Sequence, residues 1–122
     1  SARIFCWWLN SSIKIKNSTF DKNFIGIAVK DNSKATIIES NFMDNYYQLA
    51  GYAKNWRYSG GGAVRIKNSN FLSKLNRFSV LSEPGDEEDK KKKELNQNSF
   101  INISDSRIEG EIYKEGNNIL LN

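Results

Sequence analysis

An aromatic and cationic cluster lies near the middle of the chain, in the stretch YAKNWRYSGGG. Its chemistry-bearing members, all within seven positions, are Tyr52, Lys54, Trp56, Arg57 and Tyr58. Flat aromatic rings can stack on the apolar faces of sugars, while Lys and Arg recognise carboxylate or sulfate groups. The cluster therefore predicts contact with an anionic polysaccharide. The structural alternative is that Trp56 and Tyr58 fold back over the core and Arg57 packs on an aromatic ring.

Residues suited to acid–base catalysis are sparse. The chain contains no histidine, which is the commonest general base. Glu39 and Asp105 hold equivalent positions in a repeat described below, but two repeats apart, which is roughly 10 Å at the spacing of β-strands. A glycosidase needs two carboxylates about 5–9.5 Å apart across one bond. We therefore predict no catalytic residue, no metal ligand and no cofactor, and an enzyme is less expected than a binding protein.

A second basic feature comes from two alternating segments, IKIK and VRIK. Alternation places the aliphatic side chains on one face of a strand and the cations on the other. The resulting basic stripe consists of Lys14, Lys16, Arg65 and Lys67, with Thr36 and Ile38 between them. Such lysines commonly only solubilise an exposed sheet, and the functional alternative is again an anionic polysaccharide. The net charge of +4 is a mild bias toward anionic partners and not a nucleic-acid signature.

A sequence repeat positions these residues. The segment IKIKNSTF at 13–20 recurs almost unchanged as VRIKNSNF at 64–71. A related copy is ATIIESNF at 35–42, and a weaker copy is INISDSRI at 101–108. Following the central isoleucines, Ile15, Ile37, Ile66 and Ile103, the steps are 22, 29 and 37 residues. The growing steps indicate insertions into a repeat of constant basic length.

A second apolar position locates those insertions. It follows each phenylalanine after seven residues, as Ile27 after Phe20, Leu49 after Phe42, and Phe78 after Phe71. This part of the repeat is constant, so the extra residues fall after it, at 52–58 and around 82–96. The same spacing of 22 residues places Phe5 and Trp7 at the positions of Ile27 and Val29.

Short alternating segments separated by Asn, Ser, Asp and Gly predict strands joined by turns. A unit of roughly 22 residues cannot bury its own apolar edge and must stack on its neighbours. The predicted fold is all-β, a right-handed single-stranded parallel β-helix of about four to five coils with loop insertions at one corner. Stacking would bury one row of Phe20, Phe42 and Phe71 and one row of the four central isoleucines. It would place Asn17, Glu39, Asn68 and Asp105 at a turn, where such side chains can bond neighbouring backbone.

The stretch IKIKNSTFDKNFIGIAVKDNSKATIIESNFMDN at 13–45 resembles the parallel β-helix repeats of the pectate-lyase-like superfamily, as do 63–71 and 100–108. It is most similar to the non-enzymatic repeats of bacterial surface and periplasmic proteins. The resemblance implies a non-catalytic binding or spacer segment of a larger surface or secreted protein, extracellular or at the cell surface. Lyases of this superfamily bind Ca²⁺ through clustered acidic residues, whereas Asp21 here aligns with Met43.

We expect one domain over 1–122, alone or as a fragment of a longer β-helix. The stretch EPGDEEDKKKKE lies within 82–97 and predicts a solvated, mobile loop. Its acidic residues argue against nucleic acid as a partner, and no apolar run is long enough for membrane insertion. Two alternatives to the binding module stay open. One is a fragment of a polysaccharide lyase or glycoside hydrolase with its catalytic coils elsewhere. The other is a purely structural solenoid that self-associates end to end or continues into flanking coils.

Overall fold

The structure is a computed structural model that describes residues 4–6, 11–54, 60–81 and 98–122. Within these ranges the regular elements are all strands, and there is no α-helix, including none that could cross a membrane. The strands are β1 (Ile4–Cys6), β2 (Ser12–Lys16), β3 (Thr19–Asp21), β4 (Ile25–Lys30), β5 (Lys34–Ile38), β6 (Asn41–Met43), β7 (Tyr47–Tyr52), β8 (Ala63–Lys67), β9 (Asn70–Ser79), β10 (Phe100–Ser104), β11 (Arg107–Glu115) and β12 (Ile119–Leu121).

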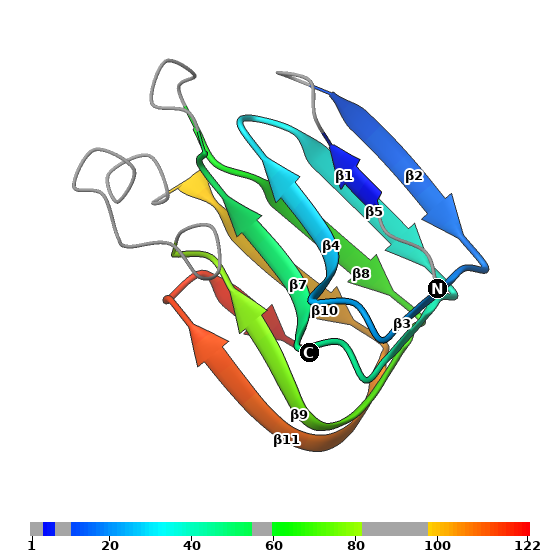
Figure 1. Cartoon of the computed structure of the whole chain (residues 1–122). Coiled ribbons are helices and arrows are strands. Elements are labelled where there is room, and N and C mark those ends of the chain that lie inside the picture. The colour runs from blue at the N-terminus through cyan, green and yellow to red at the C-terminus, as the bar shows by residue number, and fades with distance from the viewer. Residues whose placement is uncertain (1–3, 7–10, 55–59, 82–97) are drawn as a thin grey trace.

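The strands form two sheets in which every described pair is parallel (Figure 1). The five-stranded sheet has the order β12-β10-β8-β5-β2. The seven-stranded sheet has the order β1-β4-β7-β9-β6-β3, with β11 on the other side of β9. The long strands β9 and β11 bend around the lower edge of the molecule in Figure 1. The predicted all-β class with parallel strands is therefore confirmed.

The strand registers bring equivalent positions of the repeat side by side. In the five-stranded sheet, Ile37 lies opposite both Ile15 and Ile66, and Ile66 also lies opposite Ile103. In the seven-stranded sheet, Phe42 lies opposite both Phe20 and Phe71. Ile108 of the weakest copy lies opposite Phe71. The alignment read from the sequence is confirmed in all four copies.

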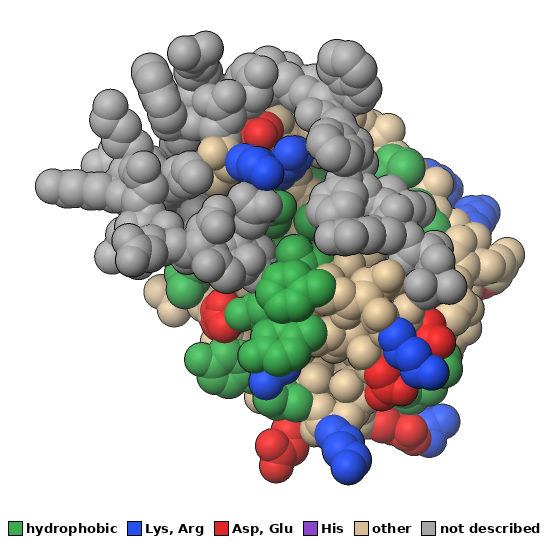
Figure 2. All heavy atoms as spheres, viewed as in Figure 1, with side chains coloured by type: hydrophobic (Ala, Val, Ile, Leu, Met, Phe, Trp, Pro, Cys, Tyr) green, Lys and Arg blue, Asp and Glu red, His purple; other side chains and the backbone are tan. Residues whose placement is uncertain are grey.

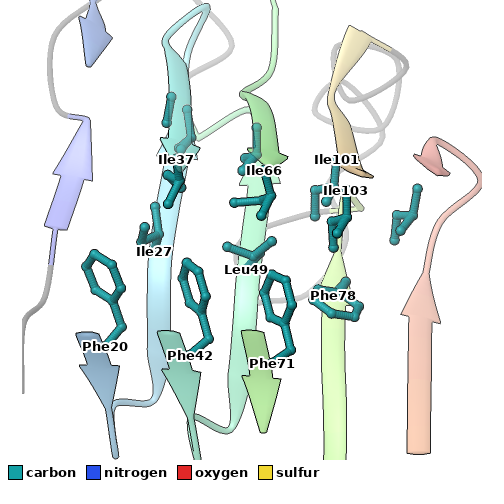
Figure 3. Close-up of a cluster of buried hydrophobic side chains, with 14 of the residues drawn as sticks. Phe20, Ile27, Ile37, Phe42, Leu49, Ile66, Phe71, Phe78, Ile101 and Ile103 are labelled. Atoms are coloured by element: carbon teal, nitrogen blue, oxygen red, sulfur yellow. The ribbon is translucent and has the colours of Figure 1, made fainter. Parts of the chain in front are cut away.

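The core lies between the two sheets and contains both predicted rows. Figure 3 shows the rings of Phe20, Phe42 and Phe71 side by side on neighbouring strands, with the isoleucines of the other sheet beyond them. The ring of Phe42 stacks on Phe20 at 5.0 Å and on Phe71 at 4.7 Å between centroids. All three rings are completely buried. This burial is the main source of stability, because removing apolar surface from water stabilises the fold by about 25 cal/mol per Å².

A turn column joins the two sheets on one side. Asn17, Glu39, Asn68 and Asp105 all have φ between 49° and 52°, a left-handed conformation that Asn and Asp tolerate better than most residues. The column was predicted to lie at a turn, and this is confirmed.

The side chains that bond the neighbouring backbone at this turn belong to the next residue, and not to the column itself. The backbone N–H of Ser18 donates to Oγ of Ser40 at 3.2 Å, that of Ser40 to Ser69 at 3.1 Å, and that of Ser69 to Ser106 at 3.0 Å. Each hydroxyl also donates to a carbonyl two residues earlier. A hydroxyl both donates and accepts, so Oγ of Ser40, Ser69 and Ser106 each bonds the backbone of its own repeat and of the preceding one.

The predicted position of the first strand is wrong by one residue. Ile4 and Cys6 lie opposite Ile27 and Val29, whereas Phe5 lies opposite Ala28. The side-chain period of a strand is two, so a one-residue shift exchanges the two faces. Trp7, the other residue placed here from the sequence, lies outside the described residues.

The two insertions fall at the same point of the repeat, as predicted. One lies between β7 and β8 and the other between β9 and β10, where the chain passes from the seven-stranded to the five-stranded sheet. The equivalent connection between β4 and β5 spans only residues 31–33. The predicted mobile loop at 82–97 lies outside the described residues and stays a prediction.

Candidate functional site

The aromatic and cationic cluster predicted from the sequence is only partly described. Tyr52 is 1% exposed, and its ring belongs to a second core cluster with Ile25, Ala28, Tyr47 and Ala50. This differs from the prediction, because an enclosed ring cannot stack on a ligand. Lys54 is exposed, and its backbone N–H donates to Oδ1 of Asp31 at 2.9 Å. Trp56, Arg57 and Tyr58 lie outside the described residues, so their ligand contact stays a prediction.

The basic stripe lies on the outer face of the five-stranded sheet. Alternation directs Ile15, Ile37 and Ile66 inward, and the residues between them therefore point outward. Strand pairing aligns the outward residues in rows, and two of these rows contain the basic stripe. The first row contains Lys14, Thr36, Arg65, Asn102 and Leu120, and the second contains Lys16, Ile38, Lys67 and Ser104. The four cations of the stripe are exposed, as the sequence predicted.

Three shallow hollows run along this outer face. Their volumes are about 320 Å³ over β2 and β5, about 230 Å³ over β5, β8 and β10, and about 620 Å³ over β8, β10 and β12. Thr36 lines the first two hollows, and Arg65 and Asn102 line the last two. Neighbouring hollows share lining residues, so they follow one another across the strands, and we call this row of hollows the groove.

The electrostatics of the groove are one-sided. Among the described residues that line the three hollows, none is Asp or Glu. The four cations of the basic stripe form no ion pair with any described carboxylate. The ion pair between Arg107 and Glu109 lies on β11, in the other sheet. Unpaired cations in a shallow groove can bind an anion without first breaking an internal salt bridge. The groove is therefore suited to a negatively charged ligand.

Arg65 contacts an aromatic ring on the neighbouring strand. Its guanidinium carbon lies 4.7 Å from the centre of the Phe100 ring, a cation–π contact that holds the side chain over β10. Ser104, in the second row, donates its hydroxyl to the carbonyl of Ile66 at 3.4 Å. Because the Phe100 ring already holds the Arg65 guanidinium, this side chain loses less entropy when it binds a carboxylate or sulfate.

A column of aromatic rings on the other sheet was missed by the sequence reasoning. Phe24 and Tyr46 are half exposed and stack at 5.5 Å. On the other face of Tyr46, the guanidinium of Arg77 lies 3.8 Å from the ring centre and donates to the Tyr46 carbonyl. Figure 2 shows hydrophobic side chains gathered on the face that β4, β7 and β9 form in Figure 1. Phe24 and Tyr46 are 22 residues apart, which is the length of one repeat, and this spacing could have predicted the column from the sequence.

Tyr46, the middle member of this column, presents its ring edge and not its ring faces. Tyr46 is covered by Phe24 on one side and by Arg77 on the other, so a sugar cannot stack on it. The shallow hollow beside the column is lined by both signs of charge, including Lys22, Lys74 and Asp44. The outer face of the five-stranded sheet is the stronger candidate site.

Tyr47, beneath the column, gives a pH prediction. Its hydroxyl donates to Oε1 of Glu115 at 2.8 Å. Burial, together with the hydrogen bond and the charge of Glu115, raises the pKa of Tyr47 from 10.0 to about 12. The folded state therefore favours the neutral phenol, and this stability is complete below pH 10 and lost as the pH rises toward 12. We expect the tyrosinate absorbance that Tyr47→Phe removes to develop near pH 12. Development of this absorbance near pH 10, the ordinary pKa of tyrosine, would contradict the prediction.

The carboxylates that the sequence analysis compared lie at the positions expected from the repeat. In the described parts of the chain, no group of three or more His, Cys, Asp and Glu could hold a metal ion. Asp21 lies opposite Met43, as predicted. Glu39 and Asp105 follow β5 and β10, which are separated by β8, so they lie two strands apart, as predicted.

Comparisons with family models, with curated proteins and with solved structures find no match for this chain. The resemblance to pectate-lyase-like repeats therefore stays a prediction, and the function has to be argued from the groove itself.

Proposed function

We propose that this chain is a non-catalytic β-helix module that binds an anionic polysaccharide along the outer face of its five-stranded sheet. It would serve as a binding or spacer segment of a larger, bacterial surface or secreted protein. The observation that carries the proposal is the groove lined by Lys14, Arg65 and Lys67, with the exposed Lys16 on the same face of β2. These cations form no ion pair with a described carboxylate, and no acidic residue is among the described residues that line the groove.

The right-handed parallel β-helix is supported by the strand pairing. Each strand of the five-stranded sheet pairs with the equivalent strand of the next repeat, and the phenylalanine strands of the other sheet do the same. Parallel crossover connections are right-handed in nearly all proteins. Such a stack offers a long, regular face, which suits an extended polymer better than a compact ligand.

A sugar polymer fits the residues between the cations. Thr36, Asn102 and Ser104 offer hydroxyl and amide groups that can bond sugar hydroxyls, and Ile38 offers a small apolar surface. Nucleic acid fits less well, because four cations are few for a phosphate backbone, and Glu39 and Asp105 flank the strand ends. The exposed Lys54 and its neighbours Trp56, Arg57 and Tyr58 are a second proposed contact for the same ligand.

Charge reversal in the groove tests the proposal. The double variant Arg65→Glu/Lys67→Glu should weaken binding to polygalacturonate or hyaluronan about 100-fold. Each tenfold change in Kd corresponds to about 1.4 kcal/mol of binding free energy. Binding by the wild type should also weaken with added salt, since exposed charges are screened over about 10 Å at 0.1 M. Isothermal titration calorimetry measures both effects, and the melting temperature checks that the variant is folded.

The matched control is Lys22→Glu/Lys74→Glu, which changes the net charge equally at two exposed positions away from the groove, one just after β3 and one on β9. It should retain binding within about threefold, because only long-range charge is altered. Equal weakening by both double variants would mean that binding follows net charge and not the groove. If the wild type binds neither polymer, the proposed function is refuted.

A further inference from the structure

We infer that the groove binds a polysaccharide across a boundary between acidic and neutral sugars. The acidic sugars lie over β2, β5 and β8, and the neutral sugars lie over β10 and β12. The inference rests on the proposed function and adds the order in which charged and neutral sugars follow one another along the ligand.

The first half of the outer face, formed by β2, β5 and β8, is cationic on every strand. Lys34 of β5 belongs to this face together with the basic stripe, because alternation directs the next residue, the buried Ala35, inward. Lys34 is exposed and lies opposite Ser12 of β2, which lines the first hollow. The cations on these three strands outnumber the one carboxylate in the turns that follow them, that of Glu39.

The second half of the face, formed by β10 and β12, carries no charge of its own. Neither strand contains Lys, Arg, Asp or Glu. The largest hollow, of about 620 Å³, lies here, and Arg65 at its border with β8 is the only charged residue among the described residues that line it. The first charged residue after β10 is Asp105, an exposed carboxylate. An acidic sugar over β10 or β12 would therefore meet no cation beyond Arg65.

The lining of the largest hollow is suited to neutral sugars. Leu120, which is 53% exposed, offers an apolar surface on which the carbon-bound hydrogens of a sugar ring can lie. Each asparagine amide offers both donors and an acceptor and can bond sugar hydroxyls, whereas a carboxylate would lose hydration here without gaining an ion pair. The asparagines that line the hollow are Asn98, Asn102, Asn117 and Asn118.

The cationic half has the length of a short block of sugars. Adjacent strands are about 4.8 Å apart, so β2 and β8, with β5 between them, are roughly 9.6 Å apart. One sugar of an extended polysaccharide advances by about the spacing of one strand, roughly 5 Å, so about three sugars lie over this half. The sugars that follow lie over β10 and β12. An acidic block of this length joined to neutral sugars therefore matches the groove.

Galacturonate oligosaccharides test this order, because methyl esterification removes the charge of a galacturonate and keeps its ring hydroxyls. The ligands are the trimer, the fully charged hexamer, and hexamers esterified on the three sugars at one end or at the other. Both esterified hexamers are measured, since a chain can enter the groove in either direction. Isothermal titration calorimetry is carried out at 0.15 M salt, where long-range attraction is screened over about 8 Å.

We expect the better of the two esterified hexamers to bind about tenfold more tightly than the trimer, a difference of about 1.4 kcal/mol. The fully charged hexamer should bind within about threefold of the trimer, because its additional carboxylates gain no ion pair. If neither esterified hexamer binds more tightly than both the trimer and the charged hexamer, the inference is overturned. Binding of the trimer or the charged hexamer in that case leaves the proposed function standing. If no ligand binds, both fail.

A variant that extends the cationic half gives a second, independent readout. Asn102→Lys places a cation on β10 and should shift the affinity ratio toward the fully charged hexamer over the better esterified hexamer by about fivefold. The control Thr19→Lys adds the same charge at an exposed position of β3, in the other sheet, and should leave the ratio unchanged. If Asn102→Lys strengthens the binding of both hexamers equally, β10 does not discriminate charged from neutral sugars and the inference is overturned.

Discussion

Phe42→Ala is expected to lower the free energy of unfolding by about 3–5 kcal/mol. Phe42 is completely buried, and its ring lies between Phe20 at 5.0 Å and Phe71 at 4.7 Å. Truncation would leave a cavity in the middle of the row, and the rings on each side are fixed by strand pairing with β6 and cannot close it. Urea denaturation followed by circular dichroism measures the loss.

Phe24→Ala is the matched control for this prediction. It removes the same atoms from a ring that is 49% exposed and stacks on Tyr46 at 5.5 Å. The expected loss in the free energy of unfolding is below about 1.5 kcal/mol. This is the upper end of what an aromatic pair contributes in addition to the burial of its surface. If the two substitutions cost the same, the phenylalanine row is not the core of the protein.

Asn76→Ala is expected to cost on the order of 3 kcal/mol, because it removes several hydrogen bonds from a buried site. The side-chain amide of Asn76 donates to the carbonyls of Ser73, Glu109 and Glu111 at 3.2, 2.8 and 3.3 Å. Its Oδ1 accepts from Nε2 of Gln48 at 2.7 Å. Both Asn76 and Gln48 are completely buried, so the groups left behind would have no water to replace the lost partner.

The bonds from Asn76 hold an irregular part of β11. The pairing of β9 and β11 shifts register between Glu109 and Glu111, around Gly110 with φ of 103°. A Cβ at Gly110 would lie 1.8 Å from the carbonyl oxygen of Ser73, so the close approach of the two strands requires glycine. The Asn76 amide satisfies the carbonyls on both sides of this bulge.

Asn70→Ala is the control for Asn76→Ala. Asn70 lies on the same strand, and its side chain makes one partly buried bond, to Oδ1 of Asn41 at 2.9 Å. Loss of a single bond of this kind costs about 1 kcal/mol. An Asn76→Ala variant as stable as Asn70→Ala would mean that the bulge keeps its geometry without the amide.

The sequence by itself determined the alignment of the repeats. Ile15, Ile37, Ile66 and Ile103 are aligned by strand pairing as their spacing predicted, although the steps between them differ. This was predictable because a one-residue slip would expose every core side chain of a strand. The outward position of the basic stripe followed from the same alternation. Neither result depends on the length of the insertions, since these begin after the constant part of the repeat.

The tertiary structure alone decided the features that lack such a pattern. In the first strand, Ile4, Phe5 and Cys6 are all apolar, so alternation could not set the register, and pairing with β4 placed Ile4 opposite Ile27. Tyr52 looked like a ligand contact, but its side chain is 1% exposed and clusters with Ala28 and Ala50 of the same sheet, a contact that cannot be read within one strand.

The groove and the buried amide network also depend on contacts between repeats. Arg65 reaches Phe100, which is 35 residues later in the sequence, and Asn76 reaches carbonyls of β11. Local patterning is read within one strand, whereas these contacts depend on which side chains the stack of repeats brings within reach. For that physical reason, the sequence predicted the rows of this protein, and only the folded structure could show the succession of hollows that lies between them.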